Sequence, residues 1–173
     1  MKTTAFASLL VLLSCTSAPA APSETPGTVL SVAIPVGAAG GALLAHDKHG
    51  FLQLAEAYAS TMVLVYTLKP LVDRTRPDGG AQSFPSGHTA SAFAGATFVQ
   101  IRYGWRLGLP AYVLAAYVGY SRVETRRHYT SDVLAGAVFG IAANLAFTRH
   151  REHIALSPDL GRGRAGVRLT IVW

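Results

Sequence analysis

The chain has 173 residues, half of them hydrophobic, and a formal net charge of +6 at pH 7. This length corresponds to one domain, and the apolar content is sufficient for a sizeable core. The sequence has no basic helix, no interleaving of basic with aromatic residues and no zinc-ligand spacing, which argues against a nucleic-acid-binding protein.

Residues 1–20 have the pattern of a secretory signal peptide: a lysine at position 2, an apolar run over 5–13 and small residues before a cleavage site after Ala20. The apolar run is too short to span a bilayer. The chain is therefore predicted to be exported. Cys15 is the only cysteine, so no disulfide is possible, and lipid attachment to Cys15 is the alternative to cleavage after Ala20.

The next segment, 21–27, contains two prolines among small polar residues and is predicted to be a linker. Residues 28–150 are predicted to form one helical domain, in which a proline at position 70 stops or kinks the second helix. Polar turns are expected at 46–50 and, with basic residues, at 102–106. The apolar stretches predict helices over 29–45, 51–68, 85–102, 107–120 and 133–147.

The C-terminal tail, 151–173, ends in a stretch over 167–173 in which every second residue is apolar, the periodicity of a strand. A glycine-rich turn at 161–164 is expected to pair this stretch with 154–156. The sequence therefore predicts an all-α fold, a bundle of about five core helices, with a short C-terminal β-hairpin or strand.

A cluster of polar residues lies between the last two predicted helices. His128 precedes Asp132 by four residues, and at helical spacing these side chains lie on one face and can form a hydrogen bond. A carboxylate on one ring nitrogen fixes the tautomer and leaves the other nitrogen free to attack an electrophile. Arg122 offers a planar set of donors suited to a phosphate. The alternative is a surface helix with a basic run and an incidental histidine–aspartate pair.

Two further polar groups lie between the second predicted helix and the first turn of the third. Lys69 and Arg76 follow the second helix, and the sequence Pro-Ser-Gly-His at 85–88 opens the third. Ser86 is a plausible N-cap, and the free amides of a helix start attract anions. A capped helix start alone explains Ser86 and Gly87 but not a histidine at position 88. In an up-and-down bundle the three groups fall at the same end, which predicts an active site there.

These groups together resemble the three-part signature of the type 2 phosphatidic acid phosphatases, the PAP2 superfamily, which includes class A acid phosphatases and vanadium haloperoxidases. The matching elements are Lys69 with Arg76-Pro77, Pro85-Ser86-Gly87-His88, and Ser121-Arg122 with His128 and Asp132. The resemblance covers residues 69–132 without a departure from the pattern. It implies a phosphoric ester hydrolase that works through a phosphohistidine.

In that scheme His128 attacks phosphorus, Asp132 orients its ring, and protonated His88 donates to the leaving oxygen. The phosphate oxygens are bound by Lys69, Arg76, Ser86, Gly87 and Arg122. No cofactor and no metal are expected, because no acidic or histidine cluster has metal-ligand spacing. A neutral His128 acting beside a charged His88 predicts a bell-shaped pH profile.

The substrate predicted from export and the apolar bundle is a lipid phosphate such as phosphatidate, phosphatidylglycerol phosphate, an isoprenyl diphosphate or lipid A. The alternatives are a soluble acid phosphatase acting on small phosphomonoesters, a vanadate-dependent haloperoxidase, and a silent relative that only binds lipid phosphate. The protein is expected in the periplasm, peripheral to or embedded in the inner membrane. The uncharged runs are shorter than the roughly 20 residues of a spanning helix, which favours the peripheral arrangement, whereas six-span members of the superfamily favour the embedded one. The sequence does not specify an oligomeric state.

Overall fold

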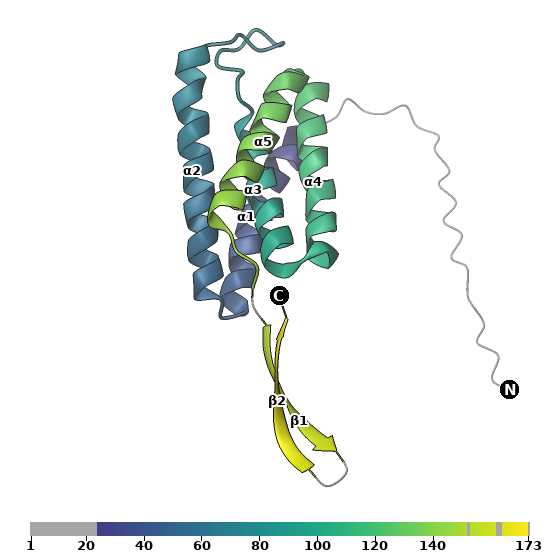
Figure 1. Ribbon diagram of the computed structural model, residues 1–173. Coiled ribbons are helices and arrows are strands. Elements are labelled where there is room, and N and C mark those ends of the chain that lie inside the picture. The colour runs from purple at the N-terminus through teal and green to yellow at the C-terminus, as the bar shows by residue number, and fades with distance from the viewer. Residues whose placement is uncertain (1–23, 152, 162–163, 173) are drawn as a thin grey trace, which may run out of the picture.

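The computed structural model describes residues 24–151, 153–161 and 164–172 (Figure 1). The predicted signal peptide, including Cys15, lies outside the described residues. The helices are α1 (Glu24–Leu44), α2 (Lys48–Val72), α3 (Gly87–Tyr103), α4 (Trp105–Glu124) and α5 (Thr130–Phe147). They run alternately up and down, so the predicted five-helix bundle is confirmed. Because α1 begins at Glu24, the end of the segment predicted as a linker, 21–27, belongs to a helix.

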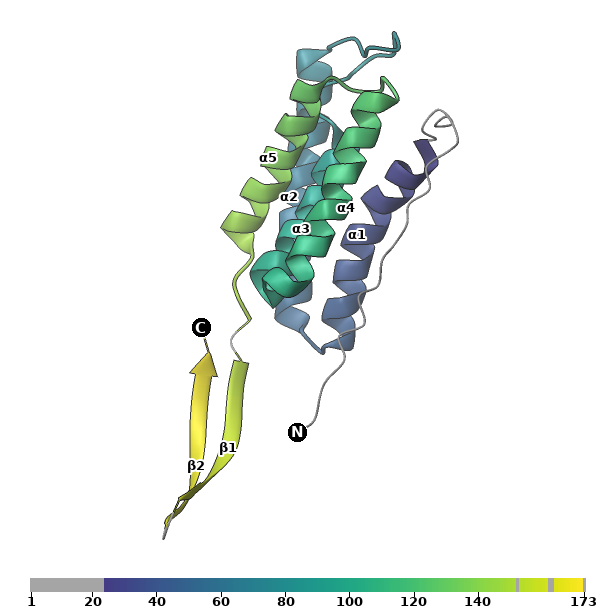
Figure 2. The same ribbon diagram turned by 90° about the vertical axis from the view of Figure 1, so that its right-hand side faces the viewer.

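Helix α3 is the centre of the bundle and contacts each of the other four helices. Figure 2 shows α1 and α5 on opposite sides of it. Its alanines at 90, 92, 94 and 96 are fully buried, and Phe98 is its largest fully buried side chain. Small side chains let the neighbouring helices approach closely. A Cβ atom added to Gly140 of α5 would lie 2.6 Å from the carbonyl oxygen of Ala90.

The helices are mostly longer than the sequence predicts, and two of the differences concern the connections between them. Pro70 does not end α2, which continues to Val72 and is closed by Asp73 in the left-handed region (φ 41°). The predicted basic turn at 102–106 is not a turn of that length: α3 runs through Tyr103 and α4 begins at Trp105. Gly104 alone joins them, and its φ of 87° is one that residues with a side chain rarely adopt. One glycine is sufficient to reverse the chain here.

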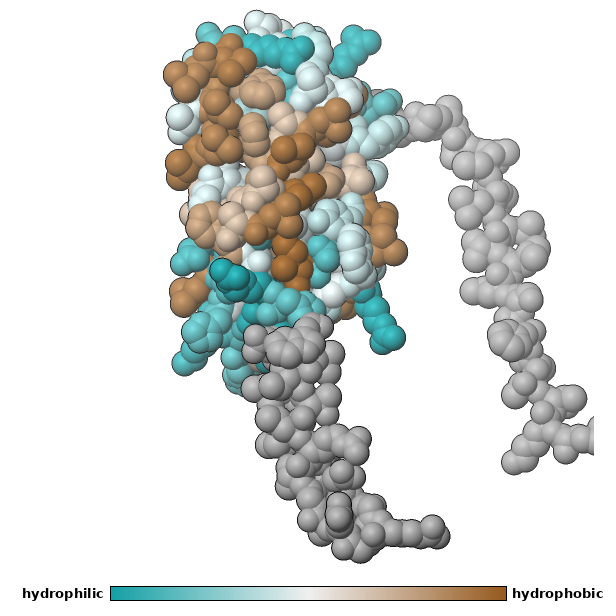
Figure 3. Space-filling model, viewed as in Figure 1, coloured by the Kyte–Doolittle hydropathy of each residue, from teal (hydrophilic) through white to brown (hydrophobic). Residues whose placement is uncertain are grey.

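The outer faces of α1, α2, α4 and α5 carry many exposed large apolar side chains, and Figure 3 shows such residues gathered along the flank of the bundle. Three described helices, spanning Thr25–Leu44, Lys48–Val72 and Thr130–Phe147, are long and apolar enough to cross a membrane. The uncharged run over 57–68 is shorter than α2 because the helix also contains Glu56 and Lys69. A helix can carry such polar groups near its ends and still reach across a bilayer. The bundle is therefore associated with a membrane.

The C-terminal strands β1 (His153–Gly161) and β2 (Arg164–Val172) form an antiparallel hairpin. Ile154 pairs with Ile171 and Leu156 with Leu169. The hairpin is longer than the predicted pairing with 154–156. It follows the end of the bundle at which α1 turns into α2 (Figure 1).

Candidate active site

A pocket of about 440 Å³ opens at the end of the bundle where α2 ends and α3 begins. Its lining comes from α1, α2, α3, α4, the loop after α2 and the turn between α4 and α5. Six residues singled out in the sequence line this one pocket: Lys69, Arg76, Gly87, His88, Arg122 and His128. The three sequence motifs thus converge at the same end of the bundle, as the up-and-down topology requires.

Ser86 lies beside the pocket but does not line it. Its side chain is fully buried at the N-cap of α3, where its Oγ lies 3.0 Å from Thr89 Oγ1 and accepts from the Thr89 amide at 3.5 Å. Its backbone N–H donates to the carbonyl of Asp132 at 3.0 Å. The hydroxyl therefore caps the helix in this structure, and its predicted contact with phosphate stays a prediction.

His128 is 3% exposed and lies in the turn between α4 and α5. The sequence prediction that His128 and Asp132 share one helical face is wrong, because α5 begins only at Thr130. The His128 Nδ1 atom is 3.8 Å from Oδ2 of Asp132, too far for a hydrogen bond, and has no hydrogen-bond partner among the described residues. Burial, with the positive charges of Arg76 and Lys69, lowers the pKa of His128 to about 4. The ring is neutral at pH 7, the state in which an imidazole nitrogen is nucleophilic.

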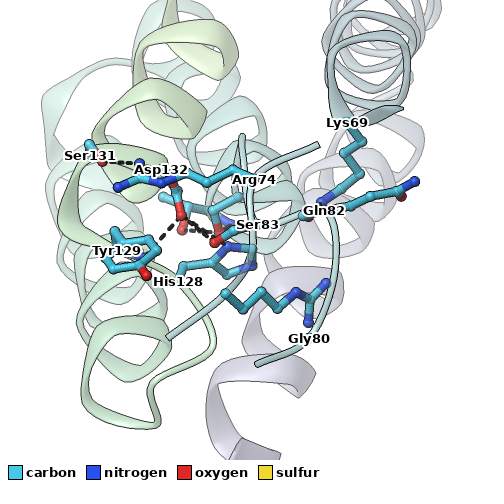
Figure 4. A network of polar contacts seen from close by, with 12 residues as sticks. Lys69, Arg74, Gly80, Gln82, Ser83, His128, Tyr129, Ser131 and Asp132 are labelled. Atoms are coloured by element: carbon cyan, nitrogen blue, oxygen red, sulfur yellow. Dashed lines mark hydrogen bonds and ion pairs between the residues drawn. The ribbon is translucent and has the colours of Figure 1, made fainter. Parts of the chain in front are cut away.

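Asp132 is fully buried behind His128 and has three hydrogen-bond donors (Figure 4). Arg74 donates to Oδ1 at 2.9 Å. At Oδ2 the carboxylate accepts from the Ser83 hydroxyl and, at 3.0 Å, from the backbone N–H of Tyr129. The contact with Tyr129 caps the start of α5. The sequence analysis missed both Arg74 and Ser83, although Arg74 stands only two residues before Arg76 in the first motif.

The cationic side chains are held by backbone and hydroxyl oxygens. Lys69 Nζ donates to the carbonyl of Gln82 at 2.9 Å, and Arg76 Nε donates to that of Ala81 at 3.0 Å. Arg122 is 2% exposed and donates to the hydroxyl of Thr28 on α1 at 3.1 Å. These contacts hold three positive charges at one pocket, and Arg127, which pairs with Asp78 at 3.0 Å, adds a fourth. The arrangement is suited to a dianion.

Helix α1 supplies a wall of the site that the sequence analysis did not anticipate. Thr28, Ser31 and Val32 line the pocket. A Cβ atom on Gly27 would collide with Ser121 and would lie 2.7 Å from a guanidinium nitrogen of Arg122. The start of α1 therefore packs directly on the arginine of the third motif, and only a glycine allows that approach.

One side of the pocket is apolar and continues along the bundle. Tyr58 and Val32 line the pocket and also a groove of about 250 Å³ between α1 and α2. The Tyr58 hydroxyl lies 3.0 Å from Ser91 Oγ, which leaves the ring as part of the wall. The remaining groove residues are all apolar: Pro35, Val36, Ala39, Phe51, Leu54 and Ala55. A cationic end and an apolar flank together match an amphiphile.

The described residues contain no group of three or more acidic, histidine or cysteine side chains placed to hold a metal ion. The lysine and arginine side chains that line the pocket are Lys69, Arg76, Arg122 and Arg127, and Arg127 is paired with Asp78 at 3.0 Å.

Comparison with known proteins agrees with this geometry. Residues 78–153 match the model of the PAP2 superfamily. The lipid A 4′-phosphatase of Helicobacter pylori is 30% identical over 150 residues, which cover 76% of each chain. The chain belongs to the PAP2 superfamily. This confirms the predicted family. The relative is a phosphatase, which agrees with the predicted class of enzyme, a phosphoric ester hydrolase.

Other relatives match over shorter regions. The lipid A 1-phosphatase of Porphyromonas gingivalis is 50% identical over 72 residues, which cover 39% of this chain but only 16% of that one. The crystal structure of Aquifex aeolicus LpxE is 26% identical with a TM-score of 0.56, covering 69% of this chain and 83% of that chain. A transmembrane PAP2-type phosphatidylglycerolphosphate phosphatase from Bacillus subtilis, 24% identical, has a TM-score of 0.59 with 72% of each chain covered. These two structures confirm the helical fold.

Proposed function

We propose that this protein hydrolyses a phosphomonoester or diphosphate carried by a lipid, through a phosphohistidine intermediate and without a metal. The observation that carries the proposal is that two features lie side by side: a cationic pocket and an apolar groove that share two lining residues. The buried, neutral His128 lines the same pocket as Lys69, Arg76 and Arg122, and the apolar groove between α1 and α2 shares Val32 and Tyr58 with that pocket.

The chemistry follows from the positions of the two histidines. Because Nδ1 of His128 faces Asp132, the other ring nitrogen, Nε2, is the atom that attacks phosphorus. The new P–N bond forms as the P–O bond to the alcohol breaks, and His88 gives its proton to the departing oxygen. His88 then accepts a proton from water, whose oxygen attacks phosphorus and releases inorganic phosphate from His128.

The charged residues act on the phosphoryl group as it is transferred. Negative charge spreads over the three equatorial oxygens of the transition state. Lys69, Arg76 and Arg122 neutralise that charge, and the amide of Gly87 at the start of α3 adds a donor. In this scheme Asp132 stabilises the positive charge that develops on the attacking ring.

A lipid substrate is favoured over a small phosphomonoester by the groove and by the relatives. The relatives include phosphatases named for lipid A and for diacylglycerol pyrophosphate. A small phosphomonoester would fill the cationic end of the pocket and leave the groove between α1 and α2 unused. We therefore assign that groove to the hydrocarbon chain of the substrate.

The substrate class is tested by comparing phosphate release from long-chain phosphatidate in detergent micelles with release from glycerol 3-phosphate, which has the same phosphate ester and no chains. Phosphatidate is expected to have the higher kcat/KM. Ala55→Trp, in the groove, is expected to slow phosphatidate hydrolysis and leave glycerol 3-phosphate hydrolysis unchanged. Ala116→Trp, on the exposed face of α4, is the matched control. Equal kcat/KM values for the two substrates, with no effect of Ala55→Trp, would contradict a lipid substrate.

The haloperoxidase alternative has a separate test, because vanadate binds in the place of phosphate. Vanadate is expected to inhibit phosphate release. Bromide oxidation by the vanadate-loaded protein would instead support the oxidoreductase.

We also propose that the site faces away from the cytoplasm. Support comes from the predicted export signal and from basic residues at the opposite end of the bundle, including Arg106, Arg149 and Arg151. In a Cys15→Ser background, a membrane-impermeant maleimide added to intact cells is expected to label Arg126→Cys, in the turn beside the site, and not Arg106→Cys. The reverse labelling pattern would overturn this orientation.

A further inference from the structure

Arg74 contacts the site from outside the pocket. Its NH1 atom donates to Oδ1 of Asp132 at 2.9 Å and to the hydroxyl of Ser131 at 2.8 Å. Its guanidinium carbon lies 4.0 Å from the centre of the Tyr129 ring. The side chain is 40% exposed, whereas that of Asp132 is fully buried, and Arg74 is not among the residues that line the pocket. A positively charged group at the surface is thus fixed on a carboxylate inside the protein.

These contacts hold the Asp132 carboxylate in one orientation. Arg74 occupies Oδ1, while the Ser83 hydroxyl and the Tyr129 amide occupy Oδ2. The backbone N–H of Ser83 also donates to the carbonyl of Arg74 at 2.7 Å, so the loop after α2 brings both side chains to Asp132 together. With its two oxygens held in this way, the carboxylate presents Oδ2 towards Nδ1 of His128, 3.8 Å away.

We propose that Arg74 is a positioning residue for the reaction: it locks the Asp132 carboxylate through Oδ1 so that Oδ2 faces the ring of His128. Arg74 touches neither the pocket nor the phosphate and acts only through Asp132. This inference rests on the proposed function for its role in turnover, but the contact itself is a property of the folded protein.

The position of Arg74 also has an electrostatic consequence. The positive charge of Arg74 partly offsets the negative charge of Asp132. The carboxylate therefore stabilises the protonated imidazole of His128 less than it would without Arg74. Removing Arg74 should raise the proton affinity of His128. The charged and titratable groups that line the pocket with His128 or pair with it are Tyr58, Tyr66, Lys69, Arg76, His88, Arg122, Arg127 and Asp132. All of them are unchanged when Arg74 is replaced.

The test is a ¹⁵N NMR titration of the His128 ring in detergent micelles, with phosphate release measured in parallel. Arg74→Gln is expected to raise the pH at which His128 titrates by about one unit. A shift of this size is expected when one positive charge on the far side of the Asp132 carboxylate is lost, at an effective dielectric constant near 20. Arg74→Lys keeps the charge and is expected to leave the titration near that of the wild type while kcat falls. Arg106→Gln, the same change at the far end of the bundle, is the control.

An unchanged titration in Arg74→Gln, or equal shifts in the Gln and Lys variants, would overturn the inference. If Arg74→Gln does not fold, the Lys variant decides: an unshifted titration with reduced kcat supports the role, and full wild-type kcat refutes it. The titration does not depend on turnover. A wild-type protein that releases no phosphate from any ester would count against the proposed function, whatever the titration shows for Arg74.

Discussion

Each end of the bundle holds a buried aspartate that accepts a backbone hydrogen bond at the start of a helix and binds an arginine. At the far end, Asp47 accepts from the Gly50 amide and takes two hydrogen bonds, of 2.6 and 2.7 Å, from Arg102. At the site end, Asp132 accepts from the Tyr129 amide and from Arg74. The two arrangements are similar in their first contacts and differ in what lies next to them.

The far end is a closed network. Arg102 also donates to the carbonyls of Arg149 and His150, and Asp47 also accepts from the Tyr103 hydroxyl at 3.1 Å. The hydrogen bonds from Arg102 hold the pKa of Asp47 well below its usual range. This network joins α2, α3 and the segment after α5. Its contacts are sufficient to explain why the residues are there, and they indicate a structural role.

The site end is not closed in this way. Beside Asp132 stands a buried histidine whose Nδ1 lacks a hydrogen bond within the described part of the chain. Beyond it lies a pocket lined by four cationic side chains, Lys69, Arg76, Arg122 and Arg127. A buried polar atom without a partner costs free energy, and positive charges aimed at one cavity repel one another. An anionic substrate relieves that repulsion. We therefore propose that similar buried pairs serve stability at one end and chemistry at the other.

The largest expected effect comes from replacing each of the two aspartates separately by asparagine. Asp132→Asn is expected to lower kcat by about 10²–10⁴-fold, because an amide cannot stabilise a positively charged ring. Asp47→Asn is expected to cost about 3–5 kcal/mol of stability, since it leaves Arg102 buried without its counter-charge, and to preserve kcat per folded molecule. Activity assays and denaturant unfolding in micelles separate the two. An Asp47 variant that loses kcat as severely as Asp132→Asn would break the comparison.

A smaller effect is expected where α5 packs on the start of α3. A Cβ atom on Gly136 would collide with the carbonyl oxygen of Ser86, so Gly136→Ala should push the Pro-Ser-Gly-His segment out of place and cost about 1–3 kcal/mol. A Cβ on Gly41 of α1 would meet nothing within 4 Å, and Gly41→Ala is expected to be neutral or to stabilise by up to about 1 kcal/mol. Thermal unfolding of both variants measures this difference. Equal losses in the two variants would show that the close approach is unimportant.

The pH dependence sharpens the comparison further. Because burial and nearby cations lower the pKa of His128 from 6.5 to about 4, the free enzyme should keep its nucleophile neutral down to about pH 4. The acidic limb of kcat/KM, corrected for ionisation of the substrate, is expected there. The unfolded state binds this proton more readily, so His128 stabilises the fold above pH 6.5 and that contribution is lost as the pH falls towards 4. An acidic limb near pH 6.5 would show that the ring is not shielded as the structure indicates.

The smallest expected effect is that of a chelator. The phosphate charge is balanced by lysine and arginine side chains, so EDTA is expected to leave phosphate release unchanged. Loss of activity in EDTA, with recovery on adding a divalent cation, would show that the cationic side chains are insufficient.

The sequence predicted the convergence of the site because its motifs fall at helix ends. Lys69 lies in the last turn of α2, Ser86 caps the start of α3, and Arg122 lies in the last turn of α4, so the alternation of an up-and-down bundle brings them together. That inference needs only the number and order of the helices, which the apolar runs indicate well.

The finer arrangement depends on the path of loops, which residue patterns do not specify. The spacing of His128 and Asp132 is helical, but the helix starts between them and the ring stands 3.8 Å from the carboxylate. Arg74 and Ser83 reach Asp132 because the loop after α2 folds back on α5, a long-range contact without a local signal. Thr28 is a neighbour of Arg122 only through the packing of α1.

The most direct test of the central claim, that His128 receives the phosphoryl group, is rapid-quench trapping with a ³²P-labelled lipid phosphate. The wild-type protein is expected to carry label that survives alkali and is lost in acid, as for a phosphorus–nitrogen bond. His128→Ala should carry none and should release phosphate at least about 10³-fold more slowly. Label of the same amount and stability on His128→Ala, or release at the wild-type rate, would contradict the account.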